Sequence, residues 1–390
     1  MSIGKERLTF FSLILLTIIV YYFSSPGETA YNYFTRLSES FLSGKLYLNE
    51  HPSWLNELVP VDNKYYVVYP PMPAILMAPF LVIFKNLLSQ TLFSIILGGI
   101  NSGLTYLLLR KINISFKTSL LVSVFFTYGT NHWYLSSIGS SWFLAHIVAI
   151  FFLLLSLIEV FGRRRLLLIG LLLGAAFWSR TTVILTLPFF YIFLYKEFWP
   201  INRKNIKNFF FFNFGVGVFV LFDLFYNFLR FGQFSPLSPY NLIPDLDKDN
   251  MFKDGFMSIE FIPRHIEASF LKLPKFQNTY PYMIPSIYSL AVWFTSPALF
   301  LIFKVRRNLL VLACWLGLIL PLAIIFTWAG VGYAQFGYRF LQDVMPFLLI
   351  LLSFGIGPNP KRIAVILVLV SILVNLWGTV YINKLNIFYM

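Results

Sequence analysis

The chain has 390 residues, of which 58% are hydrophobic, 19% aromatic and only 12% charged. About a quarter of the residues in a soluble globular domain are charged, so this composition excludes an ordinary soluble protein and indicates a membrane protein. A net charge of +14 is typical of nucleic-acid-binding proteins, but Lys and Arg also collect in the cytoplasmic loops of membrane proteins. We therefore expect a lipid bilayer, and no nucleic acid, as the partner. The single cysteine, Cys314, excludes a disulfide framework and a cysteine-rich metal site.

Apolar stretches long enough to cross a membrane recur along the chain and predict an all-α polytopic protein. No small-residue cleavage site follows the first stretch, which we interpret as an uncleaved anchor. No internal repeat or linker divides the sequence, so residues 1–390 are expected to form one integral membrane domain. The eleven predicted spans are 8–24, 90–110, 118–136, 142–161, 165–179, 182–195, 208–229, 285–303, 308–328, 339–356 and 362–382.

The basic residues predict which side of the membrane each connection faces. If every basic cluster faces the cytoplasm, 17 basic residues and three acids lie on that side of the membrane. The other 13 basic residues lie with 12 acids on the outer side, and the remaining acid, Asp223, lies in a span. This asymmetry is obtained only if a single helix crosses the membrane between residue 70 and Arg110. The predicted span 90–110 is that helix, so the apolar run 72–84 is not a span. As a helix it would reach only about 20 Å, short of the roughly 30 Å hydrocarbon core. We predict an interfacial helix that begins at its prolines.

Two outer loops stand out by their length, residues 25–89 and residues 230–284. Long loops usually carry function, and interfacial helices are predicted in the first. A carboxylate of this loop, facing a polar pocket at the outer surface, can take a proton from an acceptor hydroxyl. Glu39 and Glu50 are interpreted as solvated acids. The five acids of the loop are Glu28, Glu39, Glu50, Glu57 and Asp62.

Two arginines lie at membrane depth, where ionisable groups are costly and indicate a functional site. Arg180 in "FWSRTTVIL" is at the outer end of one span, and Arg339 in "QFGYRFLQDVMPF" is at the outer start of another. A guanidinium offers phosphate two parallel hydrogen bonds, so both arginines would suit a phosphate on a membrane-embedded ligand. Alternatively, each reaches lipid headgroups or pairs with Asp223 or Asp343. Asp343, one α-helical turn after Arg339, is expected to hold its guanidinium.

Other polar residues in apolar segments are expected to play structural parts. Asp223, Asn227 and Arg230 share one helix face, which favours a buried ion pair. His146 in "SSWFLAHIVAI" is interpreted as a hydrogen-bonded core histidine more readily than as a ligand. The sequence contains no HExxH pair, Cys/His cluster, calcium loop, P-loop or GxGxxG motif, so we expect neither a metal nor a cofactor.

Seven short motifs occur in a characteristic order: "YNYFTRLSESFLSGKLYL", "NKYYVVYPPMPAILMAPF", "SRTTVILTLPF", "YNFLRFGQ", "PRH", "SPALF" and "QFGYRFLQDVMPF". Together they resemble, over most of the chain, the C-type (GT-C) membrane glycosyltransferases. The similarity is to bacterial relatives of the dolichyl-phosphate-mannose protein mannosyltransferases and lipid A aminoarabinose transferases. The resemblance implies interfacial helices in the first outer loop, and an active site on the extracytoplasmic face of a multi-pass plasma-membrane protein.

The activity implied by the resemblance is transfer of a sugar from a polyprenyl-phosphate carrier to a hydroxyl of an acceptor glycan, lipid or protein. An acid of the first loop would be the base, and arginines or lysines would hold the carrier phosphate. Five further side chains are expected to support the site: Tyr65, Tyr66, His146, Arg264 and His265.

The resemblance leaves the base open among three acids. Better-known members begin the first loop with adjacent Asp-Glu, whereas the aligned residues here are Thr29 and Ala30, directly after Glu28. A closer subgroup carries an acid eight residues before its paired tyrosines, a position that Glu57 fills, with Asp62 nearby. The order of preference is Glu57, Asp62, Glu28. The missing Asp-Glu pair also fits an altered or lost activity.

Two other functions fit parts of the sequence. A lipid-linked-sugar flippase or secondary transporter also needs many spans and intramembrane arginines. However, the sequence lacks the internal repeat and the matching Gly/Pro-broken spans of such transporters. A non-catalytic accessory subunit of an envelope glycan assembly would fit the missing Asp-Glu pair.

Overall fold

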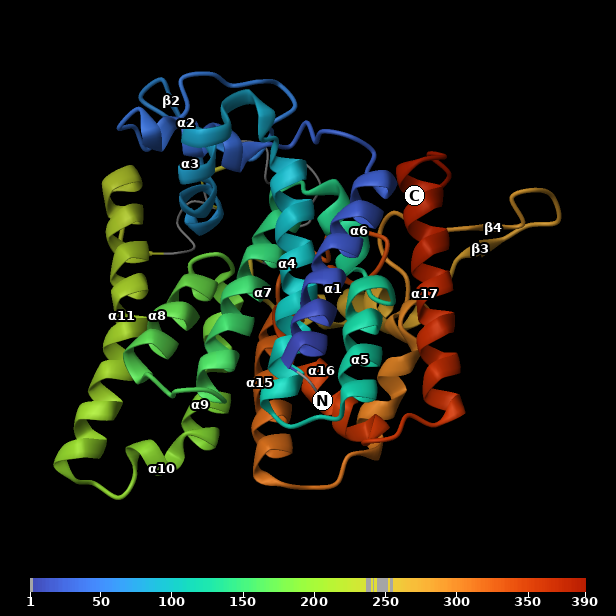
Figure 1. Cartoon of the computed structure of the whole chain (residues 1–390). Coiled ribbons are helices and arrows are strands. Elements are labelled where there is room, and N and C mark those ends of the chain that lie inside the picture. The colour runs from blue at the N-terminus through green and yellow to red at the C-terminus, as the bar shows by residue number, and fades with distance from the viewer. Residues whose placement is uncertain (1–2, 236–239, 241, 244–251, 253–254) are drawn as a thin grey trace.

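The computed structural model describes residues 3–235, 240, 242–243, 252 and 255–390, most of them in helices (Figure 1). The α-helices are α1 (Ile3–Ser24), α2 (Tyr33–Leu42), α3 (Met72–Phe84), α4 (Gln90–Lys111), α5 (Phe116–Tyr128), α6 (His132–Ile138), α7 (Ser141–Val160), α8 (Leu166–Phe177), α9 (Leu187–Phe193), α10 (Tyr195–Phe198), α11 (Arg203–Phe231), α13 (Ile262–Ile266), α14 (Val292–Thr295), α15 (Leu309–Ile325), α16 (Met345–Ile356) and α17 (Arg362–Asn383).

The remaining elements are short. The 3₁₀-helices are η1 (Lys85–Leu87), η2 (Thr181–Thr186), η3 (Ile259–Phe261), η5 (Pro297–Lys304) and η6 (Arg339–Val344), and η4 (Glu267–Leu271) is a π-helix. Strands β1 (Leu58–Val61) and β2 (Lys64–Val67) form one antiparallel hairpin, and β3 (Lys275–Phe276) and β4 (Met283–Ile284) form another.

Six helices in the described part of the chain are long and apolar enough to cross a membrane. They are Gly4–Ser24, Gln90–Lys111, Ser141–Val160, Arg203–Phe231, Arg339–Ile356 and Arg362–Asn383. In the most apolar segment of α7, 83% of the residues are buried, whereas in that of α1 only 22% are buried. The α7 helix therefore lies in the core, and α1 exposes most of its surface. The apolar surface of α1 is what a helix in contact with lipid presents.

The other five predicted spans fall on helices that are shorter or interrupted, so the number of eleven spans stays a prediction. The helices α8 and α15 have only 12 and 17 residues. The predicted span 118–136 is divided into α5 and α6 by residues 129–131. The predicted span 285–303 contains only α14 and η5, which meet at Pro297, a residue without the amide hydrogen that a continuous helix needs.

Close packing of α1 on α4 depends on two glycines in a GxxxG spacing. A Cβ atom on Gly99 would lie 2.5 Å from Cγ1 of Ile18, and one on Gly103 would lie 2.7 Å from Cγ1 of Ile14. Both distances are too short for real carbon atoms, so only glycine admits this approach. Small residues at this spacing are the usual means by which membrane helices come together.

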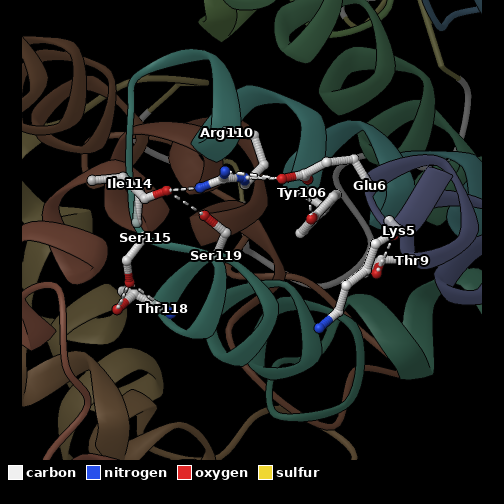
Figure 2. Close-up of polar contacts among 9 residues, drawn as sticks. All are labelled: Lys5, Glu6, Thr9, Tyr106, Arg110, Ile114, Ser115, Thr118 and Ser119. Atoms are coloured by element: carbon white, nitrogen blue, oxygen red, sulfur yellow. Dashed lines mark hydrogen bonds and ion pairs between the residues drawn. The ribbon is translucent and has the colours of Figure 1, made fainter. Parts of the chain in front are cut away.

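At one end of the molecule, the start of α1 is tied to the end of α4, and Figure 2 shows Arg110 between Glu6 and Ile114. Arg110 Nη2 and Glu6 Oε1 are 2.9 Å apart, and the hydroxyl of Tyr106 donates to the other carboxylate oxygen of Glu6. The basic clusters 5–7 and 110–117, which the charge pattern places on one side, therefore meet at one end.

The first long loop, residues 25–89, leaves from the opposite end of α1 and folds into α2, the β1–β2 hairpin and α3, which lie together in Figure 1. The 13 residues of α3 coincide with the predicted interfacial helix 72–84. The α2 helix packs on α3, and the Ser38 hydroxyl donates to the Ala74 carbonyl at 2.6 Å. The helices expected in this loop are therefore present.

The β1–β2 hairpin was not predicted, and it adds to the helices that were expected in this loop. Val61 pairs with Lys64, so Asp62 and Asn63 form a two-residue turn. Their φ angles are +49° and +59°. Two left-handed central residues are the mark of a type I′ turn, whose twist matches that of the strands and which Asn and Asp tolerate best.

The second predicted loop, 230–284, is described in part. It contains η3, α13, η4 and the β3–β4 hairpin, which projects from the side of the molecule in Figure 1. Residues 236–239, 241, 244–251 and 253–254 of this loop lie outside the described residues.

Candidate functional site

Glu57 directly precedes β1 and is held by side chains of two helices. The indole nitrogen Nε1 of Trp142 in α7 donates to Glu57 Oε2 at 2.8 Å. The backbone N–H of Glu57 donates to the hydroxyl of Tyr33 in α2 at 3.2 Å. These contacts fix the first-loop carboxylate against the amino-terminal end of α7, a helix of the core.

The surroundings of Glu57 change its acidity. Burial raises the pKa of Glu57 to about 7, although the hydrogen bond from Trp142 and the positive charge of Arg339 act in the opposite direction. A base works best when its pKa is near the operating pH.

Arg339 is buried at the start of η6 and has no carboxylate partner. It is 9% exposed and takes part in none of the ion pairs of the described residues. Its Nη1 donates to the Tyr333 carbonyl at 3.2 Å, while its Nε has no hydrogen-bond acceptor among the described residues. The guanidinium lies 5.7 Å from the Phe143 ring centroid and 5.2 Å from that of Phe340. A buried guanidinium with an unused N–H group suits an anionic ligand.

Asp343 joins three elements through its fully buried carboxylate. Its Oδ1 lies 2.6 Å from His146 Nδ1 on α7. Its Oδ2 lies 3.1 Å from Nη2 of Arg180 and accepts from the Thr182 hydroxyl at 2.7 Å. The Arg180 side chain is 23% exposed, so this ion pair lies at the edge of the core. The cluster links α7, the junction of α8 with η2, and η6.

The expected pairing of Asp343 with Arg339 is wrong, and the helix type explains the error. The prediction assumed an α-helix, in which residues four apart share a face. Both residues lie in the 3₁₀-helix η6, which has about three residues per turn, so residues four apart point about 120° away from each other. Asp343 therefore reaches Arg180, and Arg339 is left without it.

Asp223 and Arg230 do not form the direct ion pair that their spacing favoured. The indole of Trp178 and the amide of Asn227 donate to Asp223 at 3.2 and 3.3 Å. Arg230 Nη2 donates to the Asn227 side-chain oxygen at 2.7 Å. Seven residues of α-helix span about 10 Å, so the Asn227 amide bridges the two charges. This cluster has a structural role in packing α11 on α8.

The two other acids proposed as the base lie apart from Glu57. Asp62 is exposed at the tip of the β1–β2 hairpin. Glu28 lines an open groove with Lys384. No contact of the described residues joins either acid to Glu57 or Arg339. The geometry thus favours Glu57, as the sequence order of preference did.

The paired tyrosines of the first loop pack within that loop and against α11. Tyr65 stacks on His51, with ring centroids 4.7 Å apart. Tyr66 packs edge-on against Phe231 at 5.4 Å. Both tyrosines therefore stabilise the hairpin that follows Glu57, and neither contacts Arg339.

Arg264 and His265 fix the segment that leads to Arg339. Arg264 donates to the Ala329 carbonyl at 2.9 Å. His265 Nε2 lies 2.8 Å from the Trp328 carbonyl and Nδ1 lies 2.7 Å from the Tyr338 hydroxyl. Burial lowers the pKa of His265, so the neutral ring donates from Nε2 and accepts at Nδ1. Both residues position the irregular segment 328–338 and stay outside the Glu57 site.

Sequence reasoning missed three side chains of the site: Trp142, Tyr33 and Thr182. A signal existed for Trp142, which precedes His146 by one α-helical turn and therefore shares its face. Thr182 follows Arg180 by two residues in "SRTT". Tyr33 lies in the motif "YNYFTRLSESFLSGKLYL", but its contact with Glu57 depends on how the whole loop folds.

Comparison of the chain with protein-family models, with curated proteins and with solved structures gives no match. Within the described ranges, no group of three or more His, Cys, Asp and Glu residues is placed to hold a metal ion.

Proposed function

We propose that the protein is a membrane glycosyltransferase that moves a sugar from a polyprenyl-phosphate carrier to an acceptor hydroxyl. The observation that carries the proposal is Glu57. Its carboxylate accepts a hydrogen bond from Trp142 and has a pKa raised to about 7. It also interacts electrostatically with Arg339, a buried arginine that forms no ion pair with any acid of the described residues. A base beside an anion-binding group is the minimum that this transfer needs.

In the proposed reaction, the carboxylate of Glu57 removes the proton of the acceptor hydroxyl. The acceptor oxygen forms a bond to the anomeric carbon of the sugar, through an oxocarbenium-like transition state. The bond between that carbon and the carrier phosphate breaks, and its electron pair leaves with the phosphate. Because phosphate is a competent leaving group, no general acid is needed.

Arg339 is proposed to bind the carrier phosphate, and Arg180 to contribute more weakly. Arg339 has an unused N–H group, whereas the charge of Arg180 is largely neutralised by Asp343 at 3.1 Å. The negative charge on the phosphate grows as the sugar leaves, so an uncompensated guanidinium at this position would stabilise the transition state.

The proposed orientation has a cytoplasmic amino terminus, eleven passages and the Glu57 site on the extracytoplasmic side of the plasma membrane. The contact of Glu6 with Arg110 supports it, because two basic clusters meet at one end and the first loop lies at the other. A polyprenyl chain would lie in the bilayer beside the site, and the acceptor glycan, lipid or protein would approach from outside.

The test uses the purified full chain in proteoliposomes with radiolabelled polyprenyl-phosphate hexoses and pentoses, and with membranes from cells lacking the protein as the acceptor source. Appearance of label in an acceptor fraction is the expected result. Movement of intact donor across the bilayer would identify a flippase. If neither occurs with any donor, the protein would instead be a non-catalytic subunit.

A further inference from the structure

A groove of about 500 Å³ opens where the end of α1 meets the start of α4 and the end of α17. We name it the α1–α17 groove. The lining residues that matter here are Tyr22, Phe23, Glu28, Leu87, Leu92 and Lys384. No contact of the described residues connects the groove to Glu57 or Arg339, so it is a second site.

The rim of the α1–α17 groove is apolar and continues along the surface of α1. Phe23 and Leu87 are 73% and 81% exposed. Five of the exposed apolar residues of α1 recur at intervals of three and four, so these five share one helix face. That face ends at the groove and consists of Leu8, Phe11, Leu15, Ile19 and Tyr22. An apolar ligand lying along α1 would therefore reach the groove with one end.

The lining of the groove includes one cation and one anion that form no ion pair with each other. Lys384 Nζ donates to the Ser25 carbonyl and has two further N–H groups. Glu28 makes no ion pair and no side-chain hydrogen bond with any described residue. Both side chains are exposed. Opposite charges that face one groove without pairing are complementary to a ligand that carries both charges.

We propose that the α1–α17 groove binds the headgroup of a zwitterionic phospholipid with a primary ammonium, the phosphatidylethanolamine class. The phosphate contacts Lys384, the ammonium donates to Glu28, and an acyl chain follows the exposed face of α1. A primary ammonium gives charge-assisted hydrogen bonds to a carboxylate, which a quaternary ammonium cannot. An anionic headgroup would satisfy Lys384 but leave Glu28 unpaired and facing a like charge.

The test is native mass spectrometry of the detergent-purified full chain, mixed with equal amounts of phosphatidylethanolamine, phosphatidylglycerol and phosphatidylcholine of identical acyl chains. The wild type is expected to retain phosphatidylethanolamine in preference to both others. Glu28→Gln should remove the preference over phosphatidylglycerol, and Lys384→Gln should reduce retention of all three by roughly 2- to 5-fold, the range for exposed charge pairs. The matched controls are Glu39→Gln and Lys275→Gln, two exposed outer-loop charges outside the groove.

The lipid preference is the ratio of retained phosphatidylethanolamine to each of the other lipids, measured in one spectrum of folded protein. It therefore does not depend on protein yield or on sugar transfer. Equal retention of the three lipids by the wild type would overturn the proposal. So would a Glu28→Gln protein whose preference equals that of Glu39→Gln. The melting temperatures of all four variants should match the wild type, because none of these side chains is buried.

Discussion

At the scale of single residues, the raised pKa of Glu57 predicts how the reaction rate depends on pH. A base acts only when deprotonated, so kcat/KM should rise with pH through about 7 and then level off. A glutamate with an ordinary pKa of about 4.3 would already be deprotonated at pH 6. Initial rates between about pH 5 and pH 9 would reveal the inflection. A flat profile over this range would argue against Glu57 as the base.

Substitution of Glu57 separates the three acids that the sequence left open. Glu57→Gln changes the charge and almost no volume, so transfer should fall by roughly 10²- to 10⁴-fold while donor binding stays near normal. Asp62→Asn and Glu28→Gln are the matched controls, and both should keep nearly full turnover because neither carboxylate contacts the site. Loss of turnover in a control instead would move the base to that residue.

Arg339 is predicted to bind the donor phosphate. Arg339→Lys keeps the charge but loses the planar guanidinium, so donor affinity should weaken markedly, and Arg339→Ala should weaken it further. Donor affinity and melting temperature should be measured on the same preparations. A fall in melting temperature with unchanged affinity of the folded fraction would show a structural role instead.

Asp343 is predicted to act on stability more than on donor binding. Asp343→Asn leaves Arg180 without its buried counter-charge, and breaking a buried pair costs about 3–5 kcal/mol. Thr182→Val removes one hydrogen bond to the same carboxylate and should cost about 1–3 kcal/mol. Thr182→Val should therefore lower the melting temperature, and Asp343→Asn should lower it further. Similar melting temperatures for Asp343→Asn and the wild type would show that the cluster does not hold the helices together.

At the scale of elements, the arrangement of the first loop gives a prediction about sidedness. Cysteines at Asn63 and Lys85, both exposed, should react with an impermeant thiol reagent added outside intact cells. A cysteine at Arg163, exposed near the end of α7, should react only after permeabilisation. The native Cys314 is buried and serves as the unreactive background. Labelling at Lys85 only after permeabilisation would mean that α3 crosses the membrane.

The sequence predicted those elements whose signal is local. The limits of α3 followed from the prolines and the apolar run, and charge parity predicted the meeting of the basic clusters near Glu6 and Arg110. The β1–β2 hairpin carried a signal that was not used, the Asp62-Asn63 turn between alternating residues. The hydropathy of the run 118–136 did not reveal the break between α5 and α6, because only three residues, 129–131, separate the two helices.

The site was harder to predict, because its partners come from distant parts of the chain. Glu57 meets Trp142, and Asp343 meets His146 and Arg180, across 85 to 197 residues. The type of helix at η6 also mattered, since a 3₁₀-helix rotates Asp343 away from Arg339. Residue types at membrane depth therefore selected the candidates, and only the fold decided which of them pair.

At the scale of the whole molecule, the chain combines a core around α7 with helices such as α1, whose apolar surface is exposed, and a folded first loop at one end. The Glu57 site lies where that loop meets the core. A reaction between a lipid-borne donor and an acceptor from outside would need this position, because each substrate arrives from a different phase.

The most direct test of the proposed function is the balance of products formed by the wild-type protein in proteoliposomes containing a polyprenyl-phosphate sugar and acceptor membranes. Sugar transfer releases one polyprenyl phosphate for each sugar that reaches an acceptor. We predict equal amounts of free polyprenyl phosphate and glycosylated acceptor, with neither product formed above background by Glu57→Gln. Intact donor recovered on either side of the bilayer, with no free carrier phosphate, would contradict the proposed function.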